Sequence, residues 1–187
     1  MPANIHRLFF ALMPDAAALQ AIGRVVEELR SSKAVRGRWT AASKYHVTAY
    51  FLGDHATAEP VIRAACNAAP GVAFAPFSFT FDRVATFRGR HQVPCALRCT
   101  AESENLLTAL WQQLRAALAQ MPIDHEHDRR YVPHLTIAYA DRMIEPPIPI
   151  TPIQASVSEF VLVDSFIGQD RHEVVARWPL SAPISPS

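Results

Sequence analysis

Two short histidine-threonine motifs hold the side chains best suited to chemistry in this sequence. One is His-Val-Thr at 46–48 and the other is His-Leu-Thr at 134–136. In a strand, residues two apart lie on one face, so each motif would present an imidazole and a hydroxyl together. An imidazole has a pKa of ~6.5, so one ring can act as a neutral base while the other acts as a protonated acid. Threonine hydroxyls can hold phosphate oxygens as negative charge develops. The set predicts phosphodiester cleavage without a metal.

The surroundings of the motifs separate them from a chance match. A third His-x-Thr, at 55–57, follows Gly53 and leads into Pro60, which indicates a loop entering a helix. The other two motifs lie in apolar stretches with strand alternation, at 45–52 and 133–140. Either histidine alone is well explained as a structural residue. Two matching dyads favour a functional site.

The elements that must position these motifs follow from the hydrophobic pattern. Strands are predicted over 7–13, 45–52, 77–87, 93–100, 133–140, 158–167 and 173–180, and helices over 14–29, 57–66 and 107–121. Thr57 is the predicted cap of the second helix. The proline-rich stretch 146–152 is expected to be a connection. Interleaved helices and hairpins favour an α+β fold with mainly antiparallel sheets. We find no linker, so 1–187 is predicted to be a single domain with a loose tail after about residue 180.

Composition narrows the class of protein. The net charge of +1 excludes the basic stripe of a protein that tracks a duplex. The apolar run Leu8–Met13 is too short to span a membrane. An odd number of cysteines, three, does not make a disulfide framework, and we expect a cytoplasmic protein. A Cys95-Cys99 redox or metal pair is conceivable, but buried thiols more often serve as small hydrophobic residues.

Four segments carry a resemblance to a known family: 7–12, 38–54, 129–139 and 164–180. With both motifs in order, they resemble the two-histidine phosphoesterase superfamily. The similarity is strongest to its LigT-like bacterial and archaeal RNA 2′,3′-cyclic phosphodiesterases, also called 2′-5′ RNA ligases. This resemblance implies a bilobal fold with pseudo-two-fold symmetry. Each lobe would contribute one motif strand to a central groove, with helices packed outside.

The resemblance also implies roles for the motif residues. His46 would protonate the departing 3′ oxygen and His134 would activate the attacking water, which gives a 2′-phosphomonoester. Thr48 and Thr136 would bind the non-bridging oxygens. A 2′-5′ RNA ligase activity would be the reversal of a transesterification, in which an RNA hydroxyl rather than water takes part.

A base clamp is implied five residues after each histidine. The family carries an aromatic residue at the first of these positions and an arginine at the second. Here they are Phe51 and Tyr139, so the second keeps a stacking surface and loses the cation. Strict alternation would turn both away from the histidine face. A bulge or strong twist is therefore expected in each strand.

Residues outside the two motifs could also contribute to a site. Arg129 and Arg130, and Arg38 with Trp39, precede the two motifs and suit phosphate capture and stacking. The stretch 124–128 resembles a metal site but is better explained as a solvated turn, so no metal is expected. Ser165 lacks the turn of a serine nucleophile.

Three readings of the function stay open. The first is hydrolysis of RNA or nucleoside 2′,3′-cyclic phosphates, without a cofactor, because no glycine-rich nucleotide loop occurs. The second is a non-catalytic RNA- or nucleotide-binding module. The third keeps the chemistry and changes the substrate to 2′-5′ oligonucleotides or an ADP-ribose cyclic phosphate. The expected partners are RNA termini or small cyclic nucleotides. Neither a membrane nor an obligatory protein partner is predicted.

Overall fold

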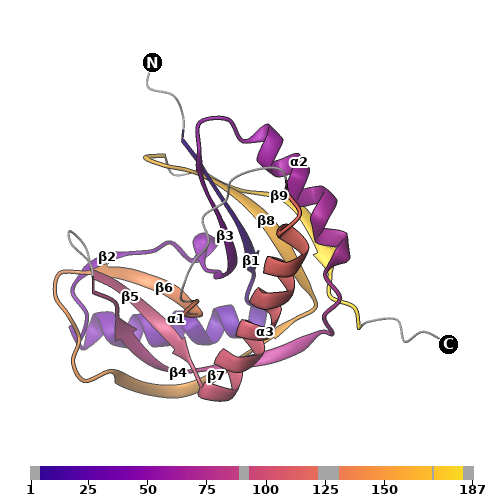
Figure 1. Ribbon diagram of the computed structural model, residues 1–187. Coiled ribbons are helices and arrows are strands. Elements are labelled where there is room, and N and C mark those ends of the chain that lie inside the picture. The colour runs from indigo at the N-terminus through magenta and orange to yellow at the C-terminus, as the bar shows by residue number, and fades with distance from the viewer. Residues whose placement is uncertain (1–4, 89–92, 122–130, 170, 183–187) are drawn as a thin grey trace.

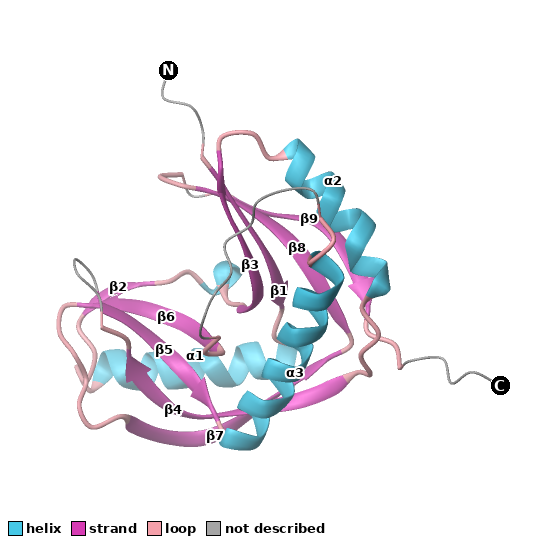
Figure 2. Ribbon diagram, in the orientation of Figure 1, coloured by secondary structure: helices cyan, strands magenta, loops and turns pink. Residues whose placement is uncertain are grey.

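The computed structural model describes residues 5–88, 93–121, 131–169 and 171–182 (Figure 1). In these residues the chain forms two antiparallel sheets, one of four strands and one of five, with helices packed against them (Figure 2). The sheets face each other at an angle, and both contribute residues to a cleft described below. The predicted α+β fold, with two lobes and mainly antiparallel sheets, is confirmed.

The four-stranded sheet combines strands from the N-terminal and the C-terminal parts of the sequence. Its order is β3-β1-β8-β9. The strands are β1 (His6–Leu12), β3 (Val47–His55), β8 (Glu159–Phe166) and β9 (His172–Pro179). All three pairings are antiparallel, and the predicted closing hairpin is the pair β8 and β9. The first motif therefore lies in a sheet completed by the end of the chain.

The five-stranded sheet carries the second motif. Its order is β2-β6-β5-β4-β7. The strands are β2 (Gly37–Trp39), β4 (Phe77–Thr86), β5 (Val93–Cys99), β6 (His134–Ala140) and β7 (Ile148–Val157). The hairpin predicted over 77–100 is the pair β4 and β5.

Three α-helices of the described chain connect and cover the sheets. They are α1 (Ala16–Ser31), α2 (Glu59–Ala68) and α3 (Ala101–Leu118), with short 3-10 turns η1 (Ala42–Lys44) and η2 (Ala69–Gly71). Helix α1 packs on β7, whereas α3 contacts β3 of one sheet and β4 of the other. The α3 stripe of Leu107, Leu110 and Leu114 is fully buried, as its spacing predicts. The predicted cap at Thr57 is wrong, because α2 begins one residue later and has no side-chain cap.

Strand β7 corrects the prediction of a connection over 146–152. The strand has ten residues, Ile148–Val157, and is an edge strand that pairs only with β4, with a register shift that leaves 150–152 without partners on β4. Proline lacks an N–H group and is tolerated at an edge, where that group would face solvent. Pro149 and Pro152 are therefore compatible with an edge strand, although their presence led to the prediction of a connection.

The hydrophobic core continues from one sheet to the other. It contains Leu12 of β1 and Leu135 of β6 within one cluster of buried side chains. A smaller cluster, Phe9, Ala11, Val161 and Val163, uses alternate positions of β1 and β8 and so lies on the opposite face of that sheet. Among the described residues, no helix has the length and hydropathy to cross a membrane.

Candidate active site

A cleft of about 630 Å³ is lined by both sheets and by the segment that joins β2 to β3. Its lining includes His46 and Thr48 of the first motif and His134 and Thr136 of the second. The structure thus brings together four side chains that are far apart in the sequence. The other lining residues are Arg7, Phe9, Arg38, Trp39, Thr40, Ala41, Lys44, Phe51, Tyr139, Ser165 and His172.

The two motif histidines are held in the same way. Nδ1 of His46 lies 2.8 Å from the carbonyl oxygen of Lys44, and Nδ1 of His134 lies 2.7 Å from that of Val132. A carbonyl oxygen only accepts, so Nδ1 carries the proton and donates in both rings. This fixes the tautomer and makes Nε2 the nitrogen that can exchange a proton with a substrate. His134 begins β6, while His46 lies one residue before β3, slightly outside the strand predicted for it.

A bulge in β3 turns Phe51 into the cleft. The register between β1 and β3 shifts at Ala49, which has no partner on β1. Ala49 and Tyr50 both face the core, with 1% and 2% of their surface exposed. The alternation is reset by this extra residue, so Thr48 and Phe51 share the cleft side.

Strand β6 has the same device. The register with β5 skips Ile137, and both Ile137 and Ala138 are fully buried. Thr136 and Tyr139 therefore lie on one side and both line the cleft. The expected irregularity in each motif strand is confirmed.

An arginine stacks on each of these aromatic rings. The Arg7 guanidinium lies 5.9 Å from the centre of the Phe51 ring, and that of Arg38 lies 4.9 Å from the centre of the Tyr139 ring. Arg38 is the cross-strand partner of Tyr139. Position 139 itself has no cation, as expected, but the neighbouring strand β2 supplies one over the Tyr139 ring.

Gly37 allows that close approach of β2 to β6. Its φ is +149°, and a Cβ there would lie 2.1 Å from the Tyr139 carbonyl oxygen. No other residue fits against that oxygen without moving the strand. The glycine thus helps to place the Arg38 guanidinium over the Tyr139 ring.

The surroundings of His46 set its charge. Its ring stacks on Phe9, 4.8 Å between ring centres, and lies 5.3 Å from the ring of His172. Burial lowers the pKa of His46 to about 4, with smaller contributions from His172 and His134, while the hydrogen bond to the Lys44 carbonyl opposes this. Without a bound anion, His46 is therefore neutral at neutral pH.

The cleft favours an anionic ligand. Arg7, Arg38 and Lys44 line it together with three histidines, and no carboxylate belongs to the described lining. Asp54 neutralises part of this charge, since its carboxylate accepts from Arg7 Nε at 2.8 Å and Nη2 at 2.7 Å. A charge of +1 on the whole chain thus coexists with a local cluster of cations.

Several lining residues were missed or undervalued from the sequence. Ser165 was set aside as a nucleophile, yet it lines the cleft, while the neighbouring Asp164 bonds His6 at 2.7 Å. His172 and Thr40 also line the cleft. Neither belongs to a recognisable sequence motif, because the fold brings them to the cleft from distant positions in the sequence. The third His-x-Thr is outside the cleft lining: His55 ends β3 and its Nε2 bonds the Leu52 carbonyl oxygen at 2.9 Å.

Other predictions have varied outcomes. Arg129, Arg130 and the stretch 124–128 lie outside the described residues. Within the part of the chain that the structure describes, no cluster of histidine, cysteine or carboxylate side chains could hold a metal ion. Burial raises the pKa of Cys95 to about 11 and of Cys99 to about 12, so both are neutral thiols that pack as small hydrophobic residues.

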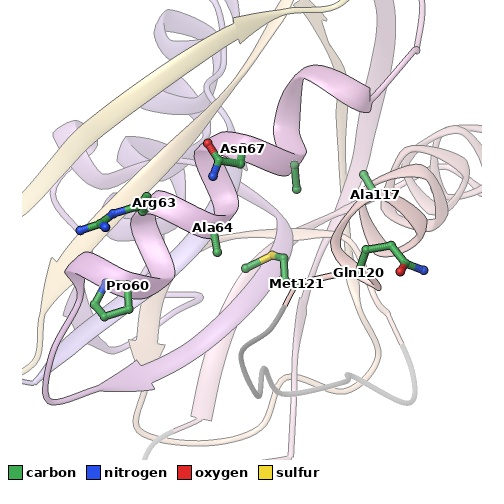
Figure 3. A pocket seen from close by; sticks show the side chains of 8 residues that line it. Pro60, Arg63, Ala64, Asn67, Ala117, Gln120 and Met121 are labelled. Carbon is green, nitrogen blue, oxygen red and sulfur yellow. The ribbon is translucent and has the colours of Figure 1, made fainter.

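A second cavity, of about 500 Å³, lies between α2 and the end of α3 (Figure 3). Its described lining lacks the acid–base side chains of the histidine cleft. It is mainly apolar and contains neither a histidine nor a hydroxyl side chain among its described residues. Its lining is Pro60, Arg63, Ala64, Asn67, Ala68, Ala117, Gln120 and Met121.

Comparison with known proteins gives consistent results. A curated RNA 2′,3′-cyclic phosphodiesterase of Geobacillus stearothermophilus is 28% identical over 92% of this chain, which spans 56% of that relative's length. E. coli LigT in its apo form is 27% identical, with a TM-score of 0.74 over 95% of this chain and 99% of LigT. Its complex with 3′-AMP gives 26% identity and a TM-score of 0.69 over 95% and 98% of the two chains. The model of the 2′-5′ RNA ligase superfamily matches residues 14–165, so the chain belongs to that superfamily.

Proposed function

We propose that this protein hydrolyses 2′,3′-cyclic phosphates at RNA ends to 2′-phosphomonoesters, without a metal, and that His46 and His134 are the acid and the base. The observation that carries the proposal is the paired geometry of the two rings. The rings lie at the starts of strands of different sheets, each has Nδ1 fixed by a backbone carbonyl, and both line one cationic cleft. The name of the curated relative supports the same reaction class.

The proposed reaction is an in-line displacement at phosphorus. Nε2 of His134 takes a proton from a water molecule as the water oxygen bonds to phosphorus. The bond from phosphorus to the 3′ oxygen breaks, and Nε2 of His46 gives that oxygen a proton. The 2′ ester remains. Thr48 and Thr136, on the same side of their strands as the histidines, would donate hydrogen bonds to the non-bridging oxygens.

The donor role of His46 depends on the substrate's own charge. With a pKa of about 4, the ring carries too little proton to act as an acid near neutral pH. A phosphodiester anion in the cleft favours the charged imidazolium and raises that pKa. The acid would therefore be formed by substrate binding, and the rate profile is expected to be bell-shaped in pH.

The terminal base is proposed to lie between Phe51 and Tyr139. Both rings line the cleft on opposite sheets, and each is backed by an arginine. Stacking on an aromatic ring contributes about 1–3 kcal/mol per base. The complex of LigT with 3′-AMP supports a nucleotide as ligand of such a cleft.

The test is hydrolysis of a nucleoside 2′,3′-cyclic phosphate in excess EDTA, with the product identified as the 2′- or 3′-phosphate. We expect the 2′-phosphate from the wild type. His46→Ala and His134→Ala should each lower turnover by about 10²–10⁴-fold. His55→Ala is the matched control, because His55 belongs to the His-x-Thr outside the cleft lining.

Three results would decide against this proposal. Wild-type turnover in either variant removes that histidine from the mechanism. Binding of the nucleotide without turnover indicates a binding module. Turnover of only a 2′-5′ oligonucleotide or an ADP-ribose cyclic phosphate, assayed in the same panel, keeps the chemistry and changes the substrate.

A further inference from the structure

A third histidine, His172, lies in the cleft beside the first motif. It is the first residue of β9 and pairs with Ser165 of β8, which in turn pairs with Arg7 of β1. Cross-strand partners on one face have Cβ atoms about 4.5–5.5 Å apart. All three side chains line the cleft, so they form a continuous polar row across three strands.

The His172 ring packs against other rings, but its Nε2 lacks a hydrogen-bond partner among the described residues. It lies 5.3 Å from the ring of His46 and 5.6 Å from that of Phe9. Its Nε2 is buried, and it has no hydrogen-bond partner among the described residues. Buried polar atoms are nearly always paired, so a ring movement that let this nitrogen bond a ligand in the cleft would break no hydrogen bond of Nε2 and would satisfy it.

The row is suited to an anion. Lys44 and Arg7 line the same part of the cleft, and no carboxylate is found in its described lining. Burial and the charge of Lys44 lower the pKa of His172, so the ring is neutral and can donate through one nitrogen. Ser165 adds a hydroxyl and Arg7 a guanidinium whose Nε and Nη2 are held by Asp54.

The proposed reaction does not use this row. Two imidazoles and two hydroxyls suffice for the reacting phosphate, and they lie at His46, His134, Thr48 and Thr136. The row begins next to His46, one side chain away from the group assigned to the leaving oxygen. A second phosphate of the substrate, attached to the same ribose, fits a polar row in that position.

We propose that His172, Ser165 and Arg7 form a second anion subsite, which binds the phosphate on the 5′ side of the terminal ribose. The preferred substrate is then an RNA 3′ end rather than a lone cyclic nucleotide. This inference depends on the proposed function, since it takes the reacting phosphate to lie at His46.

Three substrates test the subsite. They are a nucleoside 2′,3′-cyclic phosphate, the same compound with a 5′-phosphate, and a dinucleotide that ends in a 2′,3′-cyclic phosphate. We expect wild-type kcat/KM to be about tenfold higher for both compounds with the second phosphate. Preference for the dinucleotide alone would point to the second base instead and would overturn the subsite. Equal kcat/KM for all three would overturn it as well.

Two variants then locate the subsite. His172→Phe keeps a ring beside His46, and Ser165→Ala removes one hydroxyl. In each variant, the ratio of kcat/KM for the dinucleotide to kcat/KM for the nucleoside substrate should fall from about ten to about one. If a substitution acts only by disturbing His46, it lowers kcat/KM for both substrates by the same factor and leaves their ratio unchanged. An unchanged ratio would therefore contradict the proposal. Ser158 is an exposed residue between β7 and β8 and lies outside the cleft lining, so Ser158→Ala is the control and should keep the wild-type ratio.

Failure of the reaction can be told apart from failure of the subsite. If wild-type protein hydrolyses none of the three substrates, the proposed function fails. Calorimetry with a nucleoside 3′-phosphate and a dinucleotide 3′-phosphate then measures the subsite directly. A wild-type preference for the dinucleotide that His172→Phe abolishes supports it, and equal affinities reject it.

Discussion

The two motif strands have the same backbone design and different surroundings. In both, Nδ1 of the histidine bonds the carbonyl two residues earlier, a bulge follows, and an aromatic ring with a stacked arginine returns to the cleft. The His46 ring, however, packs against the rings of Phe9 and His172, whereas the centre of the His134 ring lies 4.6 Å from the centre of the Phe87 ring. The shared design places equivalent atoms of the two motifs at one cleft. The differing neighbours can make one ring an acid and the other a base.

The largest expected effect tests this division of labour. His46→Ala should lose about 10²–10⁴-fold in turnover of a 2′,3′-cyclic phosphate and most of that loss should vanish when sulfur replaces the bridging 3′ oxygen. A thiolate leaves without a proton, so it does not need the acid. His134→Ala should stay impaired with either substrate. Steady-state rates with both compounds make the comparison, and rescue of His134→Ala instead would reverse the two roles.

The second prediction concerns the charge of His46 in the folded protein. Its pKa is about 4 when folded, against ~6.5 when unfolded. Between these values the unfolded chain binds the extra proton, so the free energy of unfolding falls as the pH falls. The His46 contribution to that fall is about 3 kcal/mol from about pH 7 to about pH 4.

Urea unfolding at several pH values measures this slope. His46→Asn should remove the His46 contribution to this slope, because asparagine does not titrate. A His46→Asn slope equal to that of the wild type would show that burial does not keep His46 neutral.

The third prediction compares the two stacked aromatic residues. Phe51→Ala and Tyr139→Ala should each weaken binding of the product nucleotide by about 1–3 kcal/mol. Arg38→Gln should cost less, about 0.5–1 kcal/mol, because it removes a cation and leaves the ring. Titration calorimetry gives the affinities. Tyr139→Phe keeps the ring and should bind as the wild type does, so a large loss there would assign the role to the hydroxyl.

The smallest effect is expected at a bond between the two halves. The Tyr131 hydroxyl donates to the Thr48 carbonyl oxygen at 3.1 Å, and its ring stacks on Trp111 at 5.7 Å. Tyr131→Phe removes only the hydrogen bond, so thermal unfolding should show a loss of about 1 kcal/mol. Turnover should stay close to that of the wild type. A hundredfold loss of turnover would instead give the phenol a part in the chemistry.

Sequence patterns predicted the elements with strong periodicity and failed where context outweighed composition. The stripe of α3 and the alternation around both motifs were sufficient, because burial of one face imposes a period on the residues. Pro149 and Pro152 concealed β7, since only its position at an edge makes proline acceptable. Tyr139 was expected to lack a cation, and only the pairing of β2 with β6 shows Arg38 above its ring.

By itself, the sequence determined which side chains can perform acid–base chemistry and which face of a strand they share, because both follow from residue type and from spacing of two positions. The tertiary structure alone decided that two such strands meet over one cleft, that bulges return Phe51 and Tyr139 to it, and that His172 joins His46. These contacts join distant parts of the chain. They depend on how sheets pair and pack, a property that no local pattern of residues encodes.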